Sequence, residues 1–104
     1  MAFKFTDGNV KESIASGKLC LIDCWATWCG PCVRMSPIID EVAEEFGDKA
    51  IIGKYNVDEE SDLSAEYRIM SIPTLLFFKD GKLVDRLAGS QSKSTLEAKI
   101  NSLL

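Results

Sequence analysis

The strongest pattern in the chain is the apolar run from Leu19 to Ala26, which contains a single charged residue, Asp23. A run of this kind, without alternation, is typical of a strand that is buried on both faces of a sheet. Residues 50–57 have the same character, while Phe3-Lys4-Phe5 alternates between apolar and polar positions. The sequence therefore predicts five strands, at residues 3–5, 19–26, 50–57, 74–78 and 83–87.

Between these strands the apolar residues change to helical spacing. Residues 32–46 carry apolar side chains three or four positions apart, and Gly47 supplies a stop signal. Asn9 followed by Glu12 resembles a capping box and predicts a short helix that ends near Gly17.

Two further helices are expected in the second half of the chain. Residues 58–62 are rich in acids, which the helix dipole favours at the start of a short helix that ends at about Tyr67. Ser92 can cap a final helix with Leu96, Ile100 and Leu103 on one face.

The predicted order of elements is βαβαβαββα. The early βαβ units imply parallel strands joined by right-handed crossovers. Asp80-Gly81 between the last two strands is a strong signal for a two-residue hairpin, which makes those strands antiparallel. We therefore expect an α/β fold with a mixed sheet and helices on both of its faces.

Length and charge narrow the class of protein. With 104 residues, the chain is predicted to form a single domain over residues 1–104. The net charge is −4 and the 12 basic residues form no stripe, so nucleic acid and anionic membranes are not expected as partners. No apolar run approaches the roughly 18 residues of a membrane span. The N-terminus lacks the features of a signal peptide, which indicates a cytoplasmic protein, although a leader already removed would leave the same pattern.

The chain contains no histidine. Cys–His nucleophilic pairs, Ser–His–Asp triads and histidine-bearing zinc sites are therefore excluded. Proton transfer must involve Asp, Glu, Lys, Tyr, Cys or water.

Trp28-Cys29-Gly30-Pro31-Cys32 lies at the junction of a predicted strand and helix. Two cysteines at this spacing can form and break a disulfide without rearranging the fold, which indicates a thiol–disulfide oxidoreductase. Cys29 lies at or just before the helix N-terminus, where the dipole favours a thiolate, so it is the predicted nucleophile. Cys32, inside the helix, is the predicted resolving thiol, while Gly30 and Pro31 suit the turn and the first helical positions.

A metal site is the competing interpretation of these cysteines, beside an inert pair. Cys24, Cys29 and Cys32 match three ligands of a plant-type iron–sulfur pattern, whose fourth ligand lies downstream, whereas Cys20 lies upstream. Cys20 and Cys24 are four residues apart on a strand, about 13 Å, which is too far for one zinc ion or one disulfide. We predict no metal and no bound cofactor, and interpret Cys20 and Cys24 as small buried side chains. A secondary regulatory thiol is the alternative.

Asp23 is the second informative residue. A buried carboxylate without a partner is costly and has a raised pKa, so Asp23 is a candidate proton shuttle near neutral pH. The alternative is a strand-end aspartate that reaches water. Lys54, in the next buried strand, is either its partner or a lysine that extends its charge to solvent.

The chain closely resembles the thioredoxin family along its whole length. The resemblance rests on five segments in the right order: residues 23–32, Lys54-Tyr55-Asn56-Val57-Asp58, Ile72-Pro73-Thr74, Phe77-Phe78-Lys79-Asp80-Gly81 and Ala88-Gly89. It implies the thioredoxin fold, a five-stranded mixed sheet flanked by four helices. It also implies a protein-disulfide reductase that is a monomer.

The resemblance assigns further roles to individual residues. It implies that Pro73 is cis and packs beside the active disulfide, and that Asp23 is the buried acid/base beneath Cys32. It implies that substrate chains dock on an apolar surface and pair with the residue before Pro73 as an added strand. The surface residues are Trp28, Gly30, Pro31, Ile72, Pro73 and Gly89.

The resemblance also implies partners. A flavin-containing, NADPH-dependent thioredoxin reductase would recycle the disulfide, and reductases, peroxidases and oxidised cytosolic proteins would receive the electrons. Two alternatives remain from the residues alone: an oxidase or isomerase of an oxidising compartment, and a binding module without redox turnover.

Overall fold

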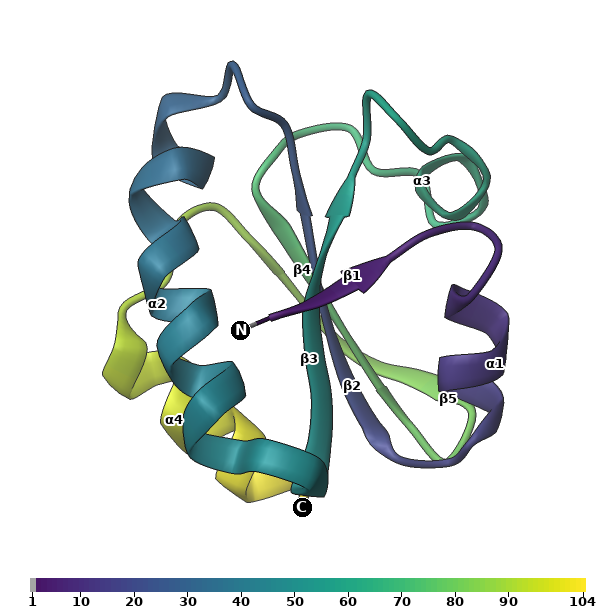
Figure 1. Cartoon of the computed structure of the whole chain (residues 1–104), viewed down its shortest axis with the longest axis vertical. Coiled ribbons are helices and arrows are strands. Elements are labelled where there is room, and N and C mark those ends of the chain that lie inside the picture. The colour runs from purple at the N-terminus through teal and green to yellow at the C-terminus, as the bar shows by residue number, and fades with distance from the viewer. Residues whose placement is uncertain (1) are drawn as a thin grey trace.

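The computed structural model describes residues 2–104 and contains five strands and four helices in the predicted order (Figure 1). The elements are β1 (Phe3–Phe5), α1 (Val10–Ala15), β2 (Leu19–Trp25), α2 (Gly30–Phe46), a 3₁₀ turn (Gly47–Lys49), β3 (Ala50–Asn56), α3 (Asp62–Glu66), β4 (Thr74–Lys79), β5 (Lys82–Ala88) and α4 (Lys93–Leu103). Most boundaries agree with the expectation to within one or two residues.

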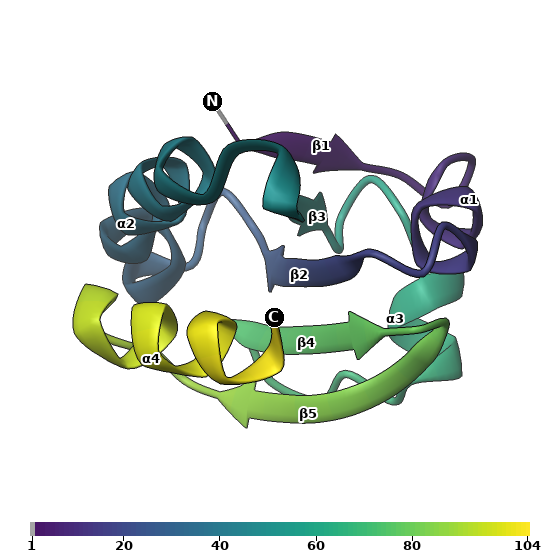
Figure 2. The same cartoon turned by 90° about the horizontal axis from the view of Figure 1, so that it is seen from below.

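The strands form one mixed sheet in the order β1-β3-β2-β4-β5. β3 pairs in parallel with β1 and β2, and β4 pairs antiparallel with β2 and β5. Helices α2 and α4 cover one face, and α1 and α3 cover the other (Figure 2). The predicted α/β architecture with a closing hairpin is confirmed.

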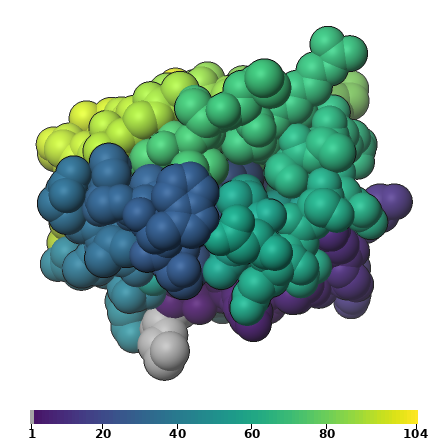
Figure 3. Space-filling view, turned by 90° about the horizontal axis from the view of Figure 1, so that it is seen from above, coloured from purple at the N-terminus to yellow at the C-terminus, as the bar shows by residue number. Residues whose placement is uncertain are grey.

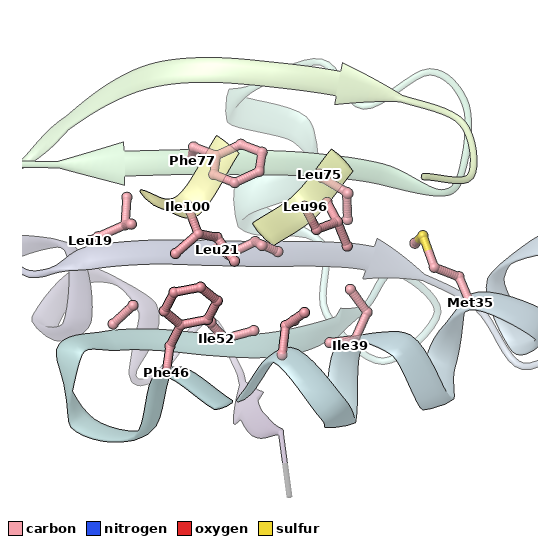
Figure 4. Close-up of a cluster of buried hydrophobic side chains, with 12 residues drawn as sticks. Leu19, Leu21, Met35, Ile39, Phe46, Ile52, Leu75, Phe77, Leu96 and Ile100 are labelled. Carbon is pink, nitrogen blue, oxygen red and sulfur yellow. The ribbon is translucent and has the colours of Figure 1, made fainter. Parts of the chain in front are cut away.

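Strand β2 is the centre of the molecule, and its alternation divides the core in two. Leu19 and Leu21 point toward α2 and α4, where Figure 4 shows the larger apolar cluster. Cys20 and Cys24 point to the opposite face, in the cluster beneath α1 and α3. Asp23 has the parity of the first pair, so it lies on the α2 face, on the opposite side from the two free cysteines.

The Asp80-Gly81 hairpin is confirmed. Both residues have positive φ, 53° and 81°, and Lys79 pairs with Lys82 across the turn. This backbone conformation is the one that two-residue hairpins need, because its twist matches that of the flanking strands.

Helix α1 begins directly after Asn9, as predicted, but the predicted side-chain capping is absent, and α3 begins only at the last residue of the acidic run. The Asn9 side chain does not cap α1; it accepts a hydrogen bond from Thr6 N–H and donates one to Lys4 O, which organises the loop before the helix. Of the acidic run 58–62, only Asp62 lies in α3. The carboxylate of Asp7 instead caps this helix from a distant part of the sequence, accepting bonds from the backbone N–H groups of residues 61–63.

Helix α2 begins at Gly30, two residues earlier than expected. Pro31 is compatible with this start because the first helical N–H groups need no intrahelical partner. Within residues 2–104, no helix is both long and apolar enough to cross a membrane.

Candidate active site

A disulfide joins Cys29 and Cys32 at the N-terminus of α2. The chain leaves β2 at Trp25, turns, and enters the helix with Cys29 in extended conformation at the N-cap position. The two Cα atoms are 5.2 Å apart, which is within the usual range for a disulfide. This is the strand-to-helix junction that the sequence predicted for the pair.

The two sulfur atoms have different surroundings. The backbone N–H of Cys32 donates a hydrogen bond to Cys29 Sγ over 3.3 Å, so that sulfur occupies the capping position of the helix. Cys29 is 6% exposed and Cys32 is fully buried. A helix N-terminus stabilises negative charge, so the arrangement favours a thiolate on the more accessible cysteine.

The residues expected to form the docking surface gather around this disulfide. Trp28 is 71% exposed, and Gly30 and Pro31 are exposed beside it. The Ile72–Pro73 peptide bond is cis, as the family resemblance implied, and the Ile72 carbonyl oxygen lies 3.8 Å from Cys29 Sγ.

Gly89 completes this surface from the end of β5. Its N–H donates to the Pro73 carbonyl over 2.8 Å, so the two segments are joined directly. Figure 3 looks onto this end of the molecule, where the blue segment at the start of α2 lies beside the teal and green segments that follow β3 and precede β4.

A shallow groove of about 210 Å³ runs beside Trp28. Its lining is Trp28, Val57, Ser64, Ile69, Met70, Ser71 and Ile72. Sequence reasoning missed Met70, which is 90% exposed. The available signal was the apolar pair Ile69-Met70 just before Ser71-Ile72-Pro73.

Asp58 is a second residue that sequence reasoning did not assign to the site. Its Oδ2 accepts a hydrogen bond from Trp28 Nε1 over 2.8 Å, which fixes the orientation of the exposed indole. Asp58 closes the segment Lys54–Asp58 quoted for the resemblance, but nothing in the local pattern linked it to Trp28.

Asp23 is buried, with 1% exposure, and neither carboxylate oxygen has a hydrogen-bond partner among the described residues. Burial raises the pKa of Asp23 to about 7, against the opposing attraction of the Lys54 charge. The carboxyl group can therefore gain and lose a proton near neutral pH. The alternative of a strand-end aspartate in water is wrong.

Lys54 is the register partner of Asp23 across β2 and β3, but its ammonium bonds elsewhere. Lys54 Nζ forms an ion pair with Asp40 Oδ1 at 3.1 Å and a hydrogen bond with Ser36 Oγ, both on α2. The lysine is thus near Asp23 without a direct bond to it, and its side chain is only 18% exposed.

Cys20 and Cys24 are fully buried free thiols. Burial raises the pKa of Cys20 to about 11, and burial followed by the negative charge of Asp23 raises that of Cys24 to about 12. In residues 2–104, no group of three or more Cys, His, Asp or Glu side chains is placed to hold a metal ion. This geometry supports the interpretation of the two thiols as small core side chains.

The site therefore combines a reversible disulfide at a helix N-terminus, an apolar exposed rim and a buried carboxyl group that titrates near pH 7. A thiolate at such a position can attack a disulfide of another molecule, and the buried partner thiol can close the internal disulfide. The arrangement is suited to thiol–disulfide exchange.

Comparison with known proteins gives a consistent result. The family model described as Thioredoxin matches residues 1–102. The thioredoxin of Alicyclobacillus acidocaldarius is 46% identical over 99 residues, covering 95% of this chain and 94% of that protein. The thioredoxin of Staphylococcus haemolyticus is 48% identical over 93 residues, covering 89% and 88% of the two chains. Among solved structures, a mutant thioredoxin from Halobacterium salinarum, with glutamine in place of one asparagine, superposes with a TM-score of 0.89 at 29% identity, covering 98% of this chain and 89% of that one.

Proposed function

The chain belongs to the thioredoxin family and is a protein-disulfide reductase with a Cys29–Cys32 redox pair, and we propose that Cys29 is the nucleophile. The observation that carries this proposal is the position of Cys29 Sγ at the N-cap of α2, where it accepts the Cys32 N–H. Both the N–H and the helix dipole favour the thiolate on this sulfur.

Exchange proceeds in two balanced steps. In the reduced protein, the Cys29 thiolate attacks a substrate disulfide; a bond forms between Cys29 and one substrate sulfur, and the other leaves as a thiolate that takes up a proton. Cys32 then loses its proton and attacks Cys29, which releases the second substrate sulfur and forms the Cys29–Cys32 disulfide. Two electrons pass to the substrate, and its two sulfurs end as thiols.

Asp23 is the proton acceptor for Cys32 in the second step, directly or through water. Support comes from its burial on the α2 face of the sheet and from its pKa of about 7, which lets it accept a proton at neutral pH and return it. Lys54, its register partner, supports this role because its positive charge lowers the pKa of Asp23, against the effect of burial, and so favours the carboxylate that accepts the proton.

Substrate chains dock on the rim of the disulfide, formed by Trp28, Gly30, Pro31, Ile72, Pro73 and Gly89. An extended peptide that pairs with the backbone at Ile72 adds as a strand. Because the Ile72 carbonyl lies 3.8 Å from Cys29 Sγ, such pairing would bring a substrate disulfide next to the nucleophile.

The partners follow from the family. A flavin-containing, NADPH-dependent thioredoxin reductase supplies the electrons, and oxidised proteins such as reductases and peroxidases receive them. The protein acts as a monomer with one domain, residues 1–104, in the cytoplasm, where substrate thiols are kept reduced.

The assignment of the two cysteines is tested by trapping. Reduced Cys32→Ser and Cys29→Ser variants are mixed with a protein disulfide, and adducts are mapped by mass spectrometry. We expect a stable mixed disulfide on Cys29 in the first variant and none in the second. Faster adduct formation on Cys32 in the second variant would reverse the assignment, and full activity of Cys29→Ser would favour a binding module.

The direction of electron flow is tested by equilibrating the protein with a defined thiol buffer and trapping free thiols. A reduction potential of about −270 mV, with two thiols changing state, would support the assignment as a reductant. A reduction potential of about −120 to −180 mV would instead place the protein among oxidases and isomerases.

A further inference from the structure

The position of the Lys54 ammonium has a consequence for Asp23. The two residues face each other across β2 and β3, and Asp23 has no hydrogen-bond partner among the described residues. A lysine so close to a buried carboxylate would ordinarily bond to it. Here α2 holds the ammonium instead, through Asp40 at 3.1 Å and Ser36 Oγ.

Asp40 and Ser36 are four residues apart on α2, so their side chains lie on the same helix face. Asp40 also accepts a hydrogen bond from the Ala2 N–H over 3.3 Å, which ties it to the start of the chain. The pair forms a fixed acceptor site for one ammonium, and we call Asp40, Ser36 and Lys54 the lysine clamp.

We propose that Asp40 and Ser36 are positioning residues that hold the Lys54 ammonium away from Asp23 and so set the pH range in which Asp23 exchanges a proton. This inference rests on the proposed role of Asp23. It adds two residues that form no hydrogen bond with Asp23 in the described part of the chain and that act through Lys54.

Electrostatics gives the sign of the effect. The Asp40 carboxylate neutralises part of the Lys54 charge, so the attraction of Lys54 for an ionised Asp23 is weakened. The pKa of Asp23, about 7, therefore stays higher than it would beside an uncompensated lysine. Removing the charge of Asp40 should lower it.

The other two charged residues that line the cavity at the clamp, Lys4 and Glu59, pair with each other. Lys4 of β1 is the register partner of Lys54 on its other side, and it forms an ion pair with Glu59 at 3.7 Å. A cavity of about 410 Å³ reaches Lys54 and Asp40 from the surface, lined also by Lys4, Glu59 and Asn56. Through it, solvent reaches the Lys54–Asp40 ion pair.

The test compares Asp40→Asn, which keeps an oxygen acceptor but removes the charge, with Glu41→Gln. Glu41 is the next residue of α2, exposed, and pairs with Lys93, so this variant removes the same charge away from the clamp. The Asp23 carboxyl group is titrated by ¹³C NMR in the oxidised protein, which requires no activity. The pH profile of protein-disulfide reduction is measured in parallel.

We expect Asp40→Asn to lower the titration midpoint of Asp23 by roughly 0.5–1 pH unit. Ser36→Ala should lower it less, because the ion pair remains. Asp40→Glu should retain the parental midpoint, and Glu41→Gln should leave it unchanged. The reduction profile should shift with the midpoint in each variant.

If the titration midpoint of Asp23 moves no further in Asp40→Asn than in Glu41→Gln, the proposed role of the lysine clamp is wrong. Near-ultraviolet circular dichroism checks that both variants are folded. A shifted midpoint with an unshifted reduction profile would confirm the electrostatics of the clamp and reject Asp23 as the proton acceptor. The two proposals therefore fail separately.

Discussion

The indole Nε1 of Trp28 donates a hydrogen bond to Asp58 Oδ2 over 2.8 Å, which joins the turn before α2 to the loop after β3. Trp28 is 71% exposed, so this bond, rather than burial, orients the ring beside the groove. The position of the large exposed indole on the proposed docking surface thus depends on one exposed carboxylate.

We expect Asp58→Ala to weaken docking. Because the bond is exposed to solvent, its loss is worth roughly 0.5–1.5 kcal/mol, which corresponds to an increase of about 2- to 13-fold in KM for a protein disulfide. Glu59→Ala is the matched control, because Glu59 is a neighbouring exposed acid that pairs with Lys4 instead. Equal KM values in the two variants would contradict the role of the bond, and urea unfolding should show little change in either.

Asp23 should make stability depend on pH. Burial raises its pKa in the folded state to about 7, above the ordinary value of 3.8. Between these values the folded protein holds a proton that the unfolded chain has released, so the stability contribution is complete below about 4 and is lost as pH rises to about 7. We therefore expect the stability of Asp23→Ala relative to the parent to rise over this window, by on the order of 2–4 kcal/mol, and then level off.

Urea unfolding of the oxidised proteins between pH 4 and 9 checks this expectation. The same variant should reduce protein disulfides more slowly, because Cys32 loses its proton acceptor. A stability difference that is constant with pH would mean that Asp23 titrates normally, and an unchanged rate across pH 6–9 would remove it from the mechanism.

Gly53 allows β1 to join the sheet. It is the register partner of Phe3 in the parallel pair of β1 and β3, and a Cβ there would clash with the Phe3 carbonyl group. We expect Gly53→Ala to lower the free energy of unfolding by roughly 1–3 kcal/mol, because backbone on β1 must move. At Gly8 a Cβ would meet its nearest neighbour at 3.6 Å, so Gly8→Ala should change stability far less, and similar losses in both would refute the steric argument.

The Asp7 carboxylate joins the loop after β1 to β3 and to the start of α3. It accepts bonds from the N–H groups of Ser61, Asp62 and Leu63 and from Tyr55 Oη at 2.8 Å. Burial alone would raise the pKa of Asp7, but these hydrogen bonds outweigh it and hold the pKa below 3.8. Its contribution to stability is therefore present above about 4 and is lost as pH falls below that value.

We expect Asp7→Ala to cost roughly 1–3 kcal/mol at pH 7, since the start of α3 loses its cap and Tyr55 a partner. Asp48→Ala, at an exposed position in the 3₁₀ turn, should be nearly neutral. Chemical denaturation gives the free energy of unfolding of both variants. If the Asp7→Ala protein is as stable as the Asp48→Ala protein, the cap is dispensable.

Cys20 and Cys24 should be inert in the native protein. Both are fully buried and have pKa values of about 11 and about 12. When the oxidised protein is treated with peroxide or an alkylating reagent, we expect neither thiol to react until the chain is unfolded. Modification of either one under native conditions would restore the regulatory-thiol hypothesis.

Local sequence patterns are enough to predict the helices and strands, their order and the position of the redox pair. These features follow from local signals: the apolar run of β2, the helical spacing in α2, the hairpin at Asp80-Gly81 and the cysteine spacing at the strand-to-helix junction. The burial of Asp23 was also predictable, because a lone charge inside an apolar run must go inside with it.

The pairing of polar side chains, by contrast, follows from the packing of distant elements. Trp28 and Asp58 are 30 residues apart, and Asp7 and Asp62 are 55 apart. Lys54 bonds to Asp40 although its register partner is Asp23. Such partnerships depend on how α2, α3 and the loops pack against the sheet, because a hydrogen bond needs its donor and acceptor atoms within roughly 3.5 Å of each other. Local patterns fix which face a side chain occupies, but the packing of distant elements brings its partner within reach.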